Sequence, residues 1–428
     1  MSSFRPGRLV GILVGTVVIL GIGVYGPATL LGPLPAVTAT TVTPAASAAA
    51  PTPPVLSANG ASAIAVLAAT TSDGSGTTST GPGVSEPLAV AGTAEALPMA
   101  SIAKVVTALV VLDAKPIPAE ESGPIVTLTA ADFQGYLDYD RIGARSVAVF
   151  AGEQWTELEL LQALLLGSSN NHADSVASWA FGSLDAYVEA ANAWLAENGL
   201  TGSAVVDATG LRDGSAGTAT DLARLAGIAA TDPIVSSILA RPASALADRR
   251  GVENTTSFLP EEGITGISRS YTDAAGVCFL FTAEVSDAES SFTFSGAFIG
   301  EPTYGALTAD LTALMESARA GVGPLPVLAA GDAYATFESV WGDEASAVVG
   351  VSRTRYSWQA ATPEAATVTL KDFATARTGA NVGQVQLTVA GEELSAALKI
   401  DRAINDPGPG WRLLHPIVMI TAVLDSRD

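Results

Sequence analysis

The sequence contains few of the residues that bind metal ions or form covalent cross-links. A single cysteine, Cys278, among 428 residues excludes an intrachain disulfide and a cysteine-based zinc cluster. The two histidines, His172 and His415, are too few for a multi-histidine metal site. We therefore expect no metal or organic cofactor, and the chemistry must come from hydroxyl, amide, amine and carboxylate side chains.

Basic residues are also scarce. Twenty-one lysines and arginines face 43 acidic residues, which gives a net charge of −22 and argues against a nucleic-acid partner. The only lysines are Lys104, Lys115, Lys371 and Lys399. A chain of 428 residues is long enough for two domains of roughly 150 residues each, plus tails.

The amino terminus is typical of a membrane-targeting segment. Residues 9–32 carry no charge, follow Arg5 and Arg8, and are followed by no charged residue before Asp73. Such a helix of roughly 17–24 apolar residues covers about 26–36 Å, close to the thickness of a bilayer core. The charge asymmetry predicts that residues 1–8 stay in the cytoplasm and that the rest of the chain is exported.

The alternative is a secretory signal peptide that is cleaved near the small residues 46–50. The chain is then secreted, whereas a retained anchor keeps it on the outer face of the cell membrane. Residues 33–60 are rich in proline, alanine and threonine, a composition that cannot form a packed core and predicts a linker.

The middle of the chain, residues 61–322, has the pattern of an α+β domain with an antiparallel sheet. Helical periodicity lies between an early pair and a late trio of strand-like runs, an order that is typical of this class. The expected helices are 101–113, 157–166, 171–180, 184–197, 219–229 and 305–320, and the expected strands are 64–69, 88–91, 264–270, 277–285 and 291–299.

A joint rich in glycine and proline follows at residues 321–326. Beyond it, short β-branched runs predict a small all-β domain over residues 323–428. The runs are 345–351, 366–370 and 384–389.

Ser101 and Lys104 form the most reactive pattern in the sequence. They lie three residues apart at the start of an expected helix, so their side chains share one face. A serine hydroxyl becomes a nucleophile when a neighbouring base removes its proton, and a buried lysine with a lowered pKa is able to do so. By itself S-x-x-K is common, and a helix-start serine with a solvated lysine is the alternative.

A second pattern, Ser168-Ser169-Asn170, lies in the expected turn between two helices. Ser168 could relay a proton, and Asn170 offers both an acceptor and donors to a substrate amide. The alternative is a helix-capping turn, which serine and asparagine also favour. We expect His172, just after this turn, to lie on the surface.

Together these segments resemble the low-molecular-weight penicillin-binding proteins, the serine D-alanyl-D-alanine carboxypeptidases. The resemblance covers roughly residues 60–320 and includes two of the three motifs of this superfamily. The matching stretches are PMASIAKVVTALVVL (98–112), VAVFAGEQWTELELLQALLLGSSNNHADSVA (147–177), DATGL (207–211) and ITGISRSYTDAAGVC (264–278).

The resemblance implies a penicillin-binding-protein or serine β-lactamase-like fold, in which a helical cluster packs on a five-stranded antiparallel sheet. It also implies a peptidoglycan stem peptide as substrate and β-lactams as inhibitors. Ser101 would form the acyl-enzyme, with Lys104 as general base and Ser168 as proton relay. Asn170 would orient the peptide, and the backbone N–H groups of Ser101 and Tyr271 would form the oxyanion hole.

The third motif departs from the family pattern K-T-G, because this position reads Ser268-Arg269-Ser270. No lysine lies between Lys115 and Lys371, so a shifted alignment restores none. Arg269 could replace part of the lost charge, although adjacent residues of a strand point to opposite faces. Ser268 and Ser270 could still hydrogen-bond a substrate carboxylate.

Three hypotheses follow. The first is a working serine D-alanyl-D-alanine carboxypeptidase, and the second is a catalytically impaired homologue that binds muropeptides or wall-synthesis partners. The third, a serine β-lactamase, lacks a clear acidic residue in the loop that would speed deacylation. The alanine-rich, lysine-poor composition resembles that of actinobacterial proteins, which places the chain in such a cell envelope. The sequence makes no prediction of oligomeric state.

Overall fold

The computed structural model describes residues 15–16, 23, 25–44, 52–71, 77–79, 87–248, 250–286, 290–358, 366–389 and 392–425. The chain forms two compact units. One comprises Ala50–Pro324 with Tyr356–Gln359, and the other comprises Met1–Ala49, Leu325–Arg355 and Ala360–Asp428.

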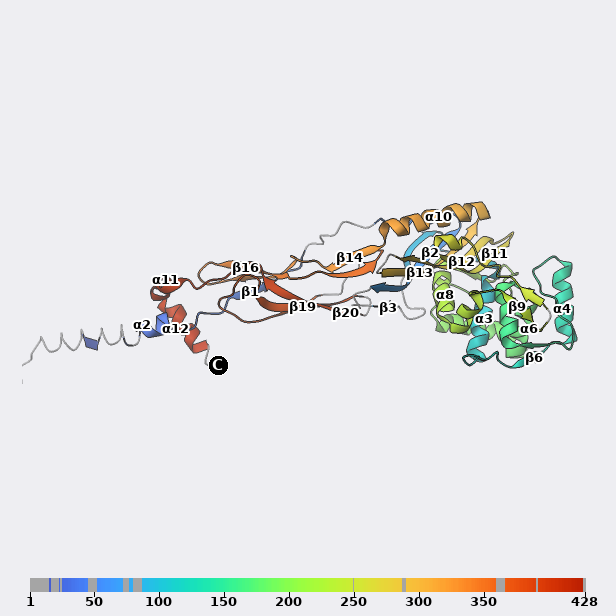
Figure 1. The fold of residues 1–428 in the computed structure, drawn as a ribbon, viewed down its shortest axis with the longest axis horizontal. Helices are drawn as coiled ribbons and strands as arrows, with labels where there is room; N and C mark the ends of the chain where they lie inside the picture. The colour runs from blue at the N-terminus through green and yellow to red at the C-terminus, as the bar shows by residue number, and fades with distance from the viewer. Residues whose placement is uncertain are drawn as a thin grey trace, which may run out of the picture. The chain divides into compact units, whose positions relative to one another are not determined.

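The first unit is built on an antiparallel sheet of six strands, one more than the resemblance implies. The strand order is β11-β12-β13-β2-β3, with β4 also paired to β2 (Figure 1). The strands are β2 (Ala61–Thr71), β3 (Thr77–Ser79), β4 (Pro87–Gly92), β11 (Ile264–Thr272), β12 (Gly276–Ser286) and β13 (Ser290–Glu301). Strand β11, which contains the third motif, lies at one end of this order.

Helices cover both faces of this sheet, because side chains alternate between two cores. On β12, Cys278 and Leu280 enter the core of the helical cluster, whereas Phe279 and Phe281 enter a second core beneath helix α10 (Tyr304–Gly321). Figure 1 shows α10 on one side of the sheet and the cluster on the other. The cluster comprises α3 (Ala103–Ala114), α5 (Glu157–Leu166), α6 (Asn170–Phe181), α7 (Leu184–Glu197) and α8 (Ala219–Thr231).

Smaller elements complete the first unit. Helix α4 (Ala130–Arg141) was not predicted, because none of its residues is fully buried and no apolar stripe marks it. Its start is fixed by a capping box between Thr129 and Asp132. The others are α9 (Pro233–Leu239), η2 (Ala100–Ile102), η3 (Pro260–Glu262), and the strand pairs β5 (Leu97–Pro98) with β8 (Ala216–Gly217), β6 (Ile125–Thr127) with β7 (Gln154–Thr156), and β9 (Ala243–Leu246) with β10 (Arg250–Val252).

The second unit contains another six-stranded antiparallel sheet, in the order β1-β15-β16-β20-β19-β18. Its strands are β1 (Thr38–Thr41), β15 (Ala333–Glu338), β16 (Glu344–Val349), β18 (Thr367–Leu370), β19 (Asn381–Val389) and β20 (Glu392–Ile400). The short pair β14 (Gly323–Leu328) and β17 (Arg353–Ser357) lies where the chain passes between the two units.

Strand β1 differs from the expectation of a linker over residues 33–60. Its four residues pair antiparallel with β15, from Thr38 opposite Glu338 to Thr41 opposite Ala335. The threonines in this stretch are β-branched and favour an extended strand, a preference that the surrounding prolines and alanines obscure in the composition. The amino-terminal segment is therefore part of the carboxy-terminal sheet.

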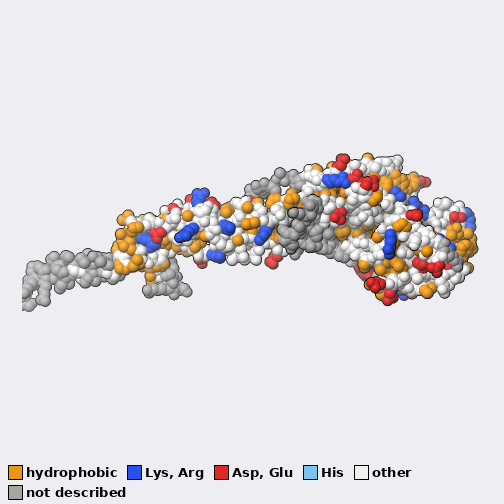
Figure 2. Space-filling model, in the orientation of Figure 1, with side chains coloured by type: hydrophobic (Ala, Val, Ile, Leu, Met, Phe, Trp, Pro, Cys, Tyr) orange, Lys and Arg blue, Asp and Glu red, His pale blue; other side chains and the backbone are white. Residues whose placement is uncertain are grey.

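Three short helices accompany this sheet: α2 (Gly26–Leu30), α11 (Gly408–Leu414) and α12 (Pro416–Asp425). Helix α2 contacts both of the others. Hydrophobic side chains gather over these helices on the face shown in Figure 2, and Leu31, Leu414 and Ile417 are each about 80% exposed.

Most of the predicted membrane segment, residues 9–32, lies outside the described residues, and its membrane role stays a prediction. In the part of the chain that the structure describes, no single helix has the length and apolar character needed to cross a bilayer. Helices α8 and α9 have the required length and apolar character only when taken together, and their axes are bent by 89° at the break between them.

Candidate active site

The expected serine–lysine pair is formed. Ser101 lies in the 3₁₀ turn η2 and Lys104 in the first turn of α3, and the lysine Nζ donates to Ser101 Oγ over 2.8 Å. A second hydrogen bond of 3.1 Å from Nζ to the Thr209 carbonyl fixes the amine. Ala100, just before the serine, has a left-handed φ of 48°, a strained conformation that is common at functional sites.

Burial makes Lys104 a base. The side chain is 2% exposed in the middle of the helical cluster, and this burial lowers its pKa from 10.5 to about 7. The carboxylates of Asp207 and Asp174 act in the opposite direction, and Arg145 lowers the pKa further. Near neutral pH a large fraction of Lys104 is therefore uncharged and able to accept the proton of Ser101.

The loop that offers the Thr209 carbonyl is organised by Asp207. The Asp207 carboxylate accepts hydrogen bonds from the hydroxyls of Thr209 and Ser215 and from the backbone N–H of Gly210. This loop contains the DATGL stretch of the sequence. Asp207 thus holds an acceptor of Lys104 in place and also supplies negative charge close to the amine.

Ser168 lies in the turn between α5 and α6, as the sequence predicts, and Asn170 is the first residue of α6. Ser168 lines the same cleft as Ser101 and Lys104 and has a left-handed φ of 50°. The Asn170 Nδ2 donates to the Arg145 carbonyl over 2.9 Å. The buried Oδ1 of Asn170 has no hydrogen-bond partner among the described residues, so it remains available to a ligand N–H.

Ser169 and Asn171 hold this turn in place through hydrogen bonds on the side away from the cleft. Ser169 Oγ donates to Asn171 Oδ1 over 2.8 Å, and both oxygens accept the backbone N–H of Val147. Asn171 also donates its Nδ2 to the Val147 carbonyl. The turn is therefore tied to the segment around residue 147.

His172 is not on the surface, contrary to expectation. It is fully buried, because α6 is enclosed by other helices, and its ring packs 4.7 Å from that of Trp155. Burial lowers the pKa of His172 to about 3, so the ring stays neutral, with Nδ1 2.8 Å from Ser169 Oγ. The histidine is part of the support of the turn.

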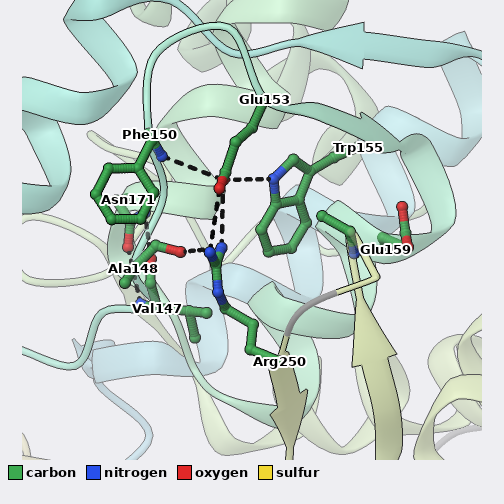
Figure 3. A network of polar contacts seen from close by, with 9 residues as sticks. Val147, Ala148, Phe150, Glu153, Trp155, Glu159, Asn171 and Arg250 are labelled. Atoms are coloured by element: carbon green, nitrogen blue, oxygen red, sulfur yellow. Dashed lines mark hydrogen bonds and ion pairs between the residues drawn. The ribbon is translucent and has the colours of Figure 1, made fainter.

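Sequence reasoning missed an ion pair that braces the same region (Figure 3). Arg250 of β10 binds Glu153 through Nη2 and Oε1 at 3.1 Å, and its guanidinium lies 5.6 Å from the Trp155 ring. Glu153 also accepts the N–H groups of Trp155 and Phe150. Burial raises the pKa of Glu153, but these hydrogen bonds outweigh it and hold the pKa below its usual value. Nothing in the spacing of Arg250 and Glu153 signals this contact.

A second unpredicted group lies behind Lys104. The Tyr139 hydroxyl, on α4, donates to Asp174 Oδ2 on α6 over 2.6 Å. Burial raises the pKa of Asp174 to about 6, so the group is largely ionised above neutral pH and adds negative charge near the lysine. The sequence gives no sign that Asp174 meets Tyr139, because α4 carries no recognisable pattern.

The third motif is split between the two faces of the sheet. Ser268 lies opposite Leu280 and Ser270 opposite Cys278, both in the core on the side of Ser101. Arg269 lies opposite Phe279, in the core beneath α10.

Arg269 also borders the cleft, but its guanidinium lies 5.1 Å from the Phe258 ring and 5.8 Å from the Tyr304 ring. These aromatic contacts hold its charge on the α10 side of the sheet. The expectation that Arg269 replaces the missing lysine charge beside Ser101 therefore does not match its placement.

The remaining predicted residues occupy the outermost strand of the sheet. Ser268 lines the cleft, and Ser270 is buried with a hydroxyl that finds no partner in the described part of the chain. Tyr271 is exposed, and its hydroxyl donates to Asp273. Strand β11 is an end strand of the sheet and contacts η2, and its residues 267–269 line the cleft together with Ser101. No group of three or more potential metal ligands occurs among the described residues.

Comparisons with known proteins agree with this architecture. A family model for D-alanyl-D-alanine carboxypeptidase matches residues 88–291. The chain is 28% identical over 209 residues to a D-alanyl-D-alanine endopeptidase of Pseudomonas aeruginosa, a match that covers 47% of this chain and 64% of the relative. The chain thus spans slightly less than two thirds of that relative's length.

A second D-alanyl-D-alanine endopeptidase, from Escherichia coli K12, is 26% identical over 243 residues and covers 54% of this chain and 73% of its own length. Among solved structures, penicillin binding protein 5 from Haemophilus influenzae has a TM-score of 0.55 at 18% identity, over 83% of this chain and 99% of that structure. This likeness confirms the predicted fold.

Proposed function

Because residues 88–291 match the family model for D-alanyl-D-alanine carboxypeptidase, we propose that the protein is a serine peptidase of peptidoglycan stem peptides. The observation that carries the proposal is the 2.8 Å hydrogen bond between the buried Lys104 amine and Ser101 Oγ. A nucleophile paired with a base whose pKa is about 7 is suited to acyl transfer near neutral pH.

In the proposed reaction, Ser101 Oγ bonds to the carbonyl carbon between two D-alanyl residues while Lys104 takes the hydroxyl proton. The C–N bond then breaks, and the leaving amine receives that proton through the Ser168 hydroxyl. Water next attacks the ester, its proton passes to Lys104, and the ester C–O bond breaks. The proton returns to Ser101, so the enzyme is regenerated and a shortened peptide is released.

Two further groups position the peptide in this proposal. The unpartnered Oδ1 of Asn170 accepts an N–H of the acyl side. The edge of β11 aligns the backbone as an added strand, and the N–H groups of Ser101 and Tyr271 stabilise the oxyanion. Removing one donor of this kind typically costs about 10²–10³ in rate.

The proposal is tested by incubating the full chain with millimolar benzylpenicillin and measuring the intact mass. We expect one penicilloyl adduct on the wild type and on Ser236→Ala, which changes an exposed serine of α9. Ser101→Ala should form none. An adduct that persists in Ser101→Ala would show that another group is acylated. A folded wild-type protein that forms no adduct would contradict the proposal that the protein is a serine peptidase.

The placement of Arg269 supports a second candidate, a catalytically impaired homologue that binds muropeptides, because the third motif supplies no cation on the face of Ser101. This candidate predicts that calorimetry detects muropeptide binding in a protein that forms no penicilloyl adduct. The same two measurements therefore separate the candidates.

A further inference from the structure

Among the described residues, the cleft around Ser101 has no free cation on its β11 side. Among the described residues that line it, only Lys104 and Arg269 are charged. Lys104 already donates to Ser101 Oγ and to the Thr209 carbonyl. The guanidinium of Arg269 lies over Phe258 and Tyr304, on the opposite face of the sheet.

Neutral hydroxyl groups occupy this side of the cleft instead. Ser268 lines the cleft, and Ser270 lies behind it on the same face of β11, which meets the helical cluster; the two serines are 6% and 7% exposed. The Ser270 hydroxyl is buried and finds no hydrogen-bond partner within the described ranges. Thr255 and Thr256 also line the cleft, but their hydroxyl protons are already used: Thr255 donates to the Leu166 carbonyl, and Thr256 donates to Asn254 Oδ1 or the Gly266 carbonyl.

These hydroxyl groups suit a carboxamide better than a carboxylate. A carboxylate only accepts hydrogen bonds, and burying it without a counter-charge is costly. A carboxamide both donates and accepts, as a serine hydroxyl does, and carries no charge. The threonine oxygens, whose protons are already used, remain acceptors that repel a carboxylate but can receive an amide N–H.

We propose that the peptide accepted at Ser101 carries a neutral amide, rather than a free carboxylate, on the leaving side of the scissile bond, with Ser268 and Ser270 as the residues that determine this preference. The inference rests on the proposed function and specifies its substrate class. Two sources supply this chemistry: a terminal D-amino acid whose carboxyl is amidated, and a chain that continues beyond the scissile bond.

The test compares three synthetic peptides with the full chain. They share an acetylated Lys-D-Ala-D-Ala sequence and end in a free carboxylate, in a carboxamide, or in one further glycine amide. We expect kcat/KM for the carboxamide peptide to exceed that for the carboxylate peptide by about tenfold or more. The reason is that the carboxylate would be buried in the cleft without a counter-charge. A rate for the extended peptide similar to that for the carboxamide identifies the continued chain as an acceptable source.

Ser268→Lys provides the specificity test, because it returns a cation to the cleft face of β11. We expect this variant to shift the carboxamide-to-carboxylate ratio of kcat/KM towards the carboxylate by about tenfold. Thr265→Lys adds the same charge at an exposed position of the strand and should leave the ratio unchanged. Arg269→Met should also leave it unchanged, since that guanidinium lies on the other face.

A wild-type preference for the carboxylate, or a ratio that Ser268→Lys does not alter in a folded protein, would overturn the inference. The wild-type comparison alone decides it if the lysine variant fails to fold. A penicilloyl adduct on Ser101 together with equal rates for all peptides overturns only this inference. Absence of both the adduct and peptide hydrolysis overturns the proposed function and the inference with it.

Discussion

At the scale of single residues, the ability of Lys104 to act as a base depends on its surroundings in the fold. The three-residue spacing to Ser101 is visible in the sequence and predicts that the two side chains meet, as they do at 2.8 Å. The property that matters chemically, a pKa lowered to about 7, arises from burial by helices contributed from distant segments. The Thr209 carbonyl and the Asp174 carboxylate come from those segments as well, so the spacing of residues does not show that they lie near the Lys104 amine.

The pKa of Lys104 predicts a pH dependence of acylation. The amine must be neutral to take a proton, so the rate of penicilloyl formation should rise with pH through a midpoint near 7 and fall about tenfold per unit below it. Asp174→Asn removes a negative charge that favours the ammonium form, so the midpoint should move to lower pH. The measurement is the acylation rate from pH 5 to 9.

Asp185→Asn is the matched control, because Asp185 is exposed on α7 and lies in the same cluster of helices. Its midpoint should equal that of the wild type. A profile that is flat between pH 5 and 9, or an unchanged midpoint in a folded Asp174→Asn protein, would exclude Lys104 as the group that controls acylation.

At the scale of elements, burial decided which parts of the fold the sequence could predict. Helices α5 and α7 have the predicted bounds because an apolar face meets the core and a capping residue starts each helix. Helix α4 lies on the surface and was missed. Within β11 the alternation of faces was predictable, and it separates Arg269 from Ser268, but only the aromatic rings of Phe258 and Tyr304 show where the guanidinium goes.

The Arg250–Glu153 pair joins β10 to the segment that precedes β7, and we expect it to stabilise the Ser168–Asn170 turn. Arg250→Met leaves a carboxylate that is 4% exposed without its counter-charge, which should lower the free energy of unfolding by about 3 kcal/mol. The acylation rate should fall as well, because Val147, bound to Ser169 and Asn171, lies on the same segment. Urea unfolding and penicillin acylation are the two measurements.

Arg141→Met is the control for loss of an arginine ion pair, since the Arg141–Asp138 pair is exposed and should contribute at most about 0.5 kcal/mol. Adding Glu153→Gln to Arg250→Met should recover part of the lost stability, because the buried charge is then removed. Equal destabilisation by Arg250→Met and Arg141→Met would show that the buried pair does not brace this region.

At the scale of the whole molecule, the two compact units predict separate responses to a truncation. A chain lacking residues 1–44 loses β1 and exposes the edge of β15, so the carboxy-terminal sheet should unfold at a lower temperature. The unit that contains Ser101 keeps all of its strands, and its penicilloyl adduct should form at the wild-type rate. Calorimetry and intact mass report the two units separately.

A truncation of residues 1–32, which removes α2 but retains β1, is the control and should lower the melting temperature of the sheet less than removal of residues 1–44 does. Loss of the adduct on removal of residues 1–44, but not of 1–32, would contradict the independence of the two units.

The pairing of β1 with β15 makes the unit with Ser101 an insertion within the chain of the other unit. The polypeptide starts one sheet, leaves to build the helical cluster, and returns to complete the sheet it began. A pulling force applied on the amino-terminal side of α2 therefore acts on the contacts of α2 with α11 and α12 and on the hydrogen bonds between β1 and β15, all of which precede β2 in the chain. Opening of this four-residue pairing would lengthen the chain on the amino-terminal side of the unit with Ser101 without breaking any strand pair in the sheet that β11 belongs to.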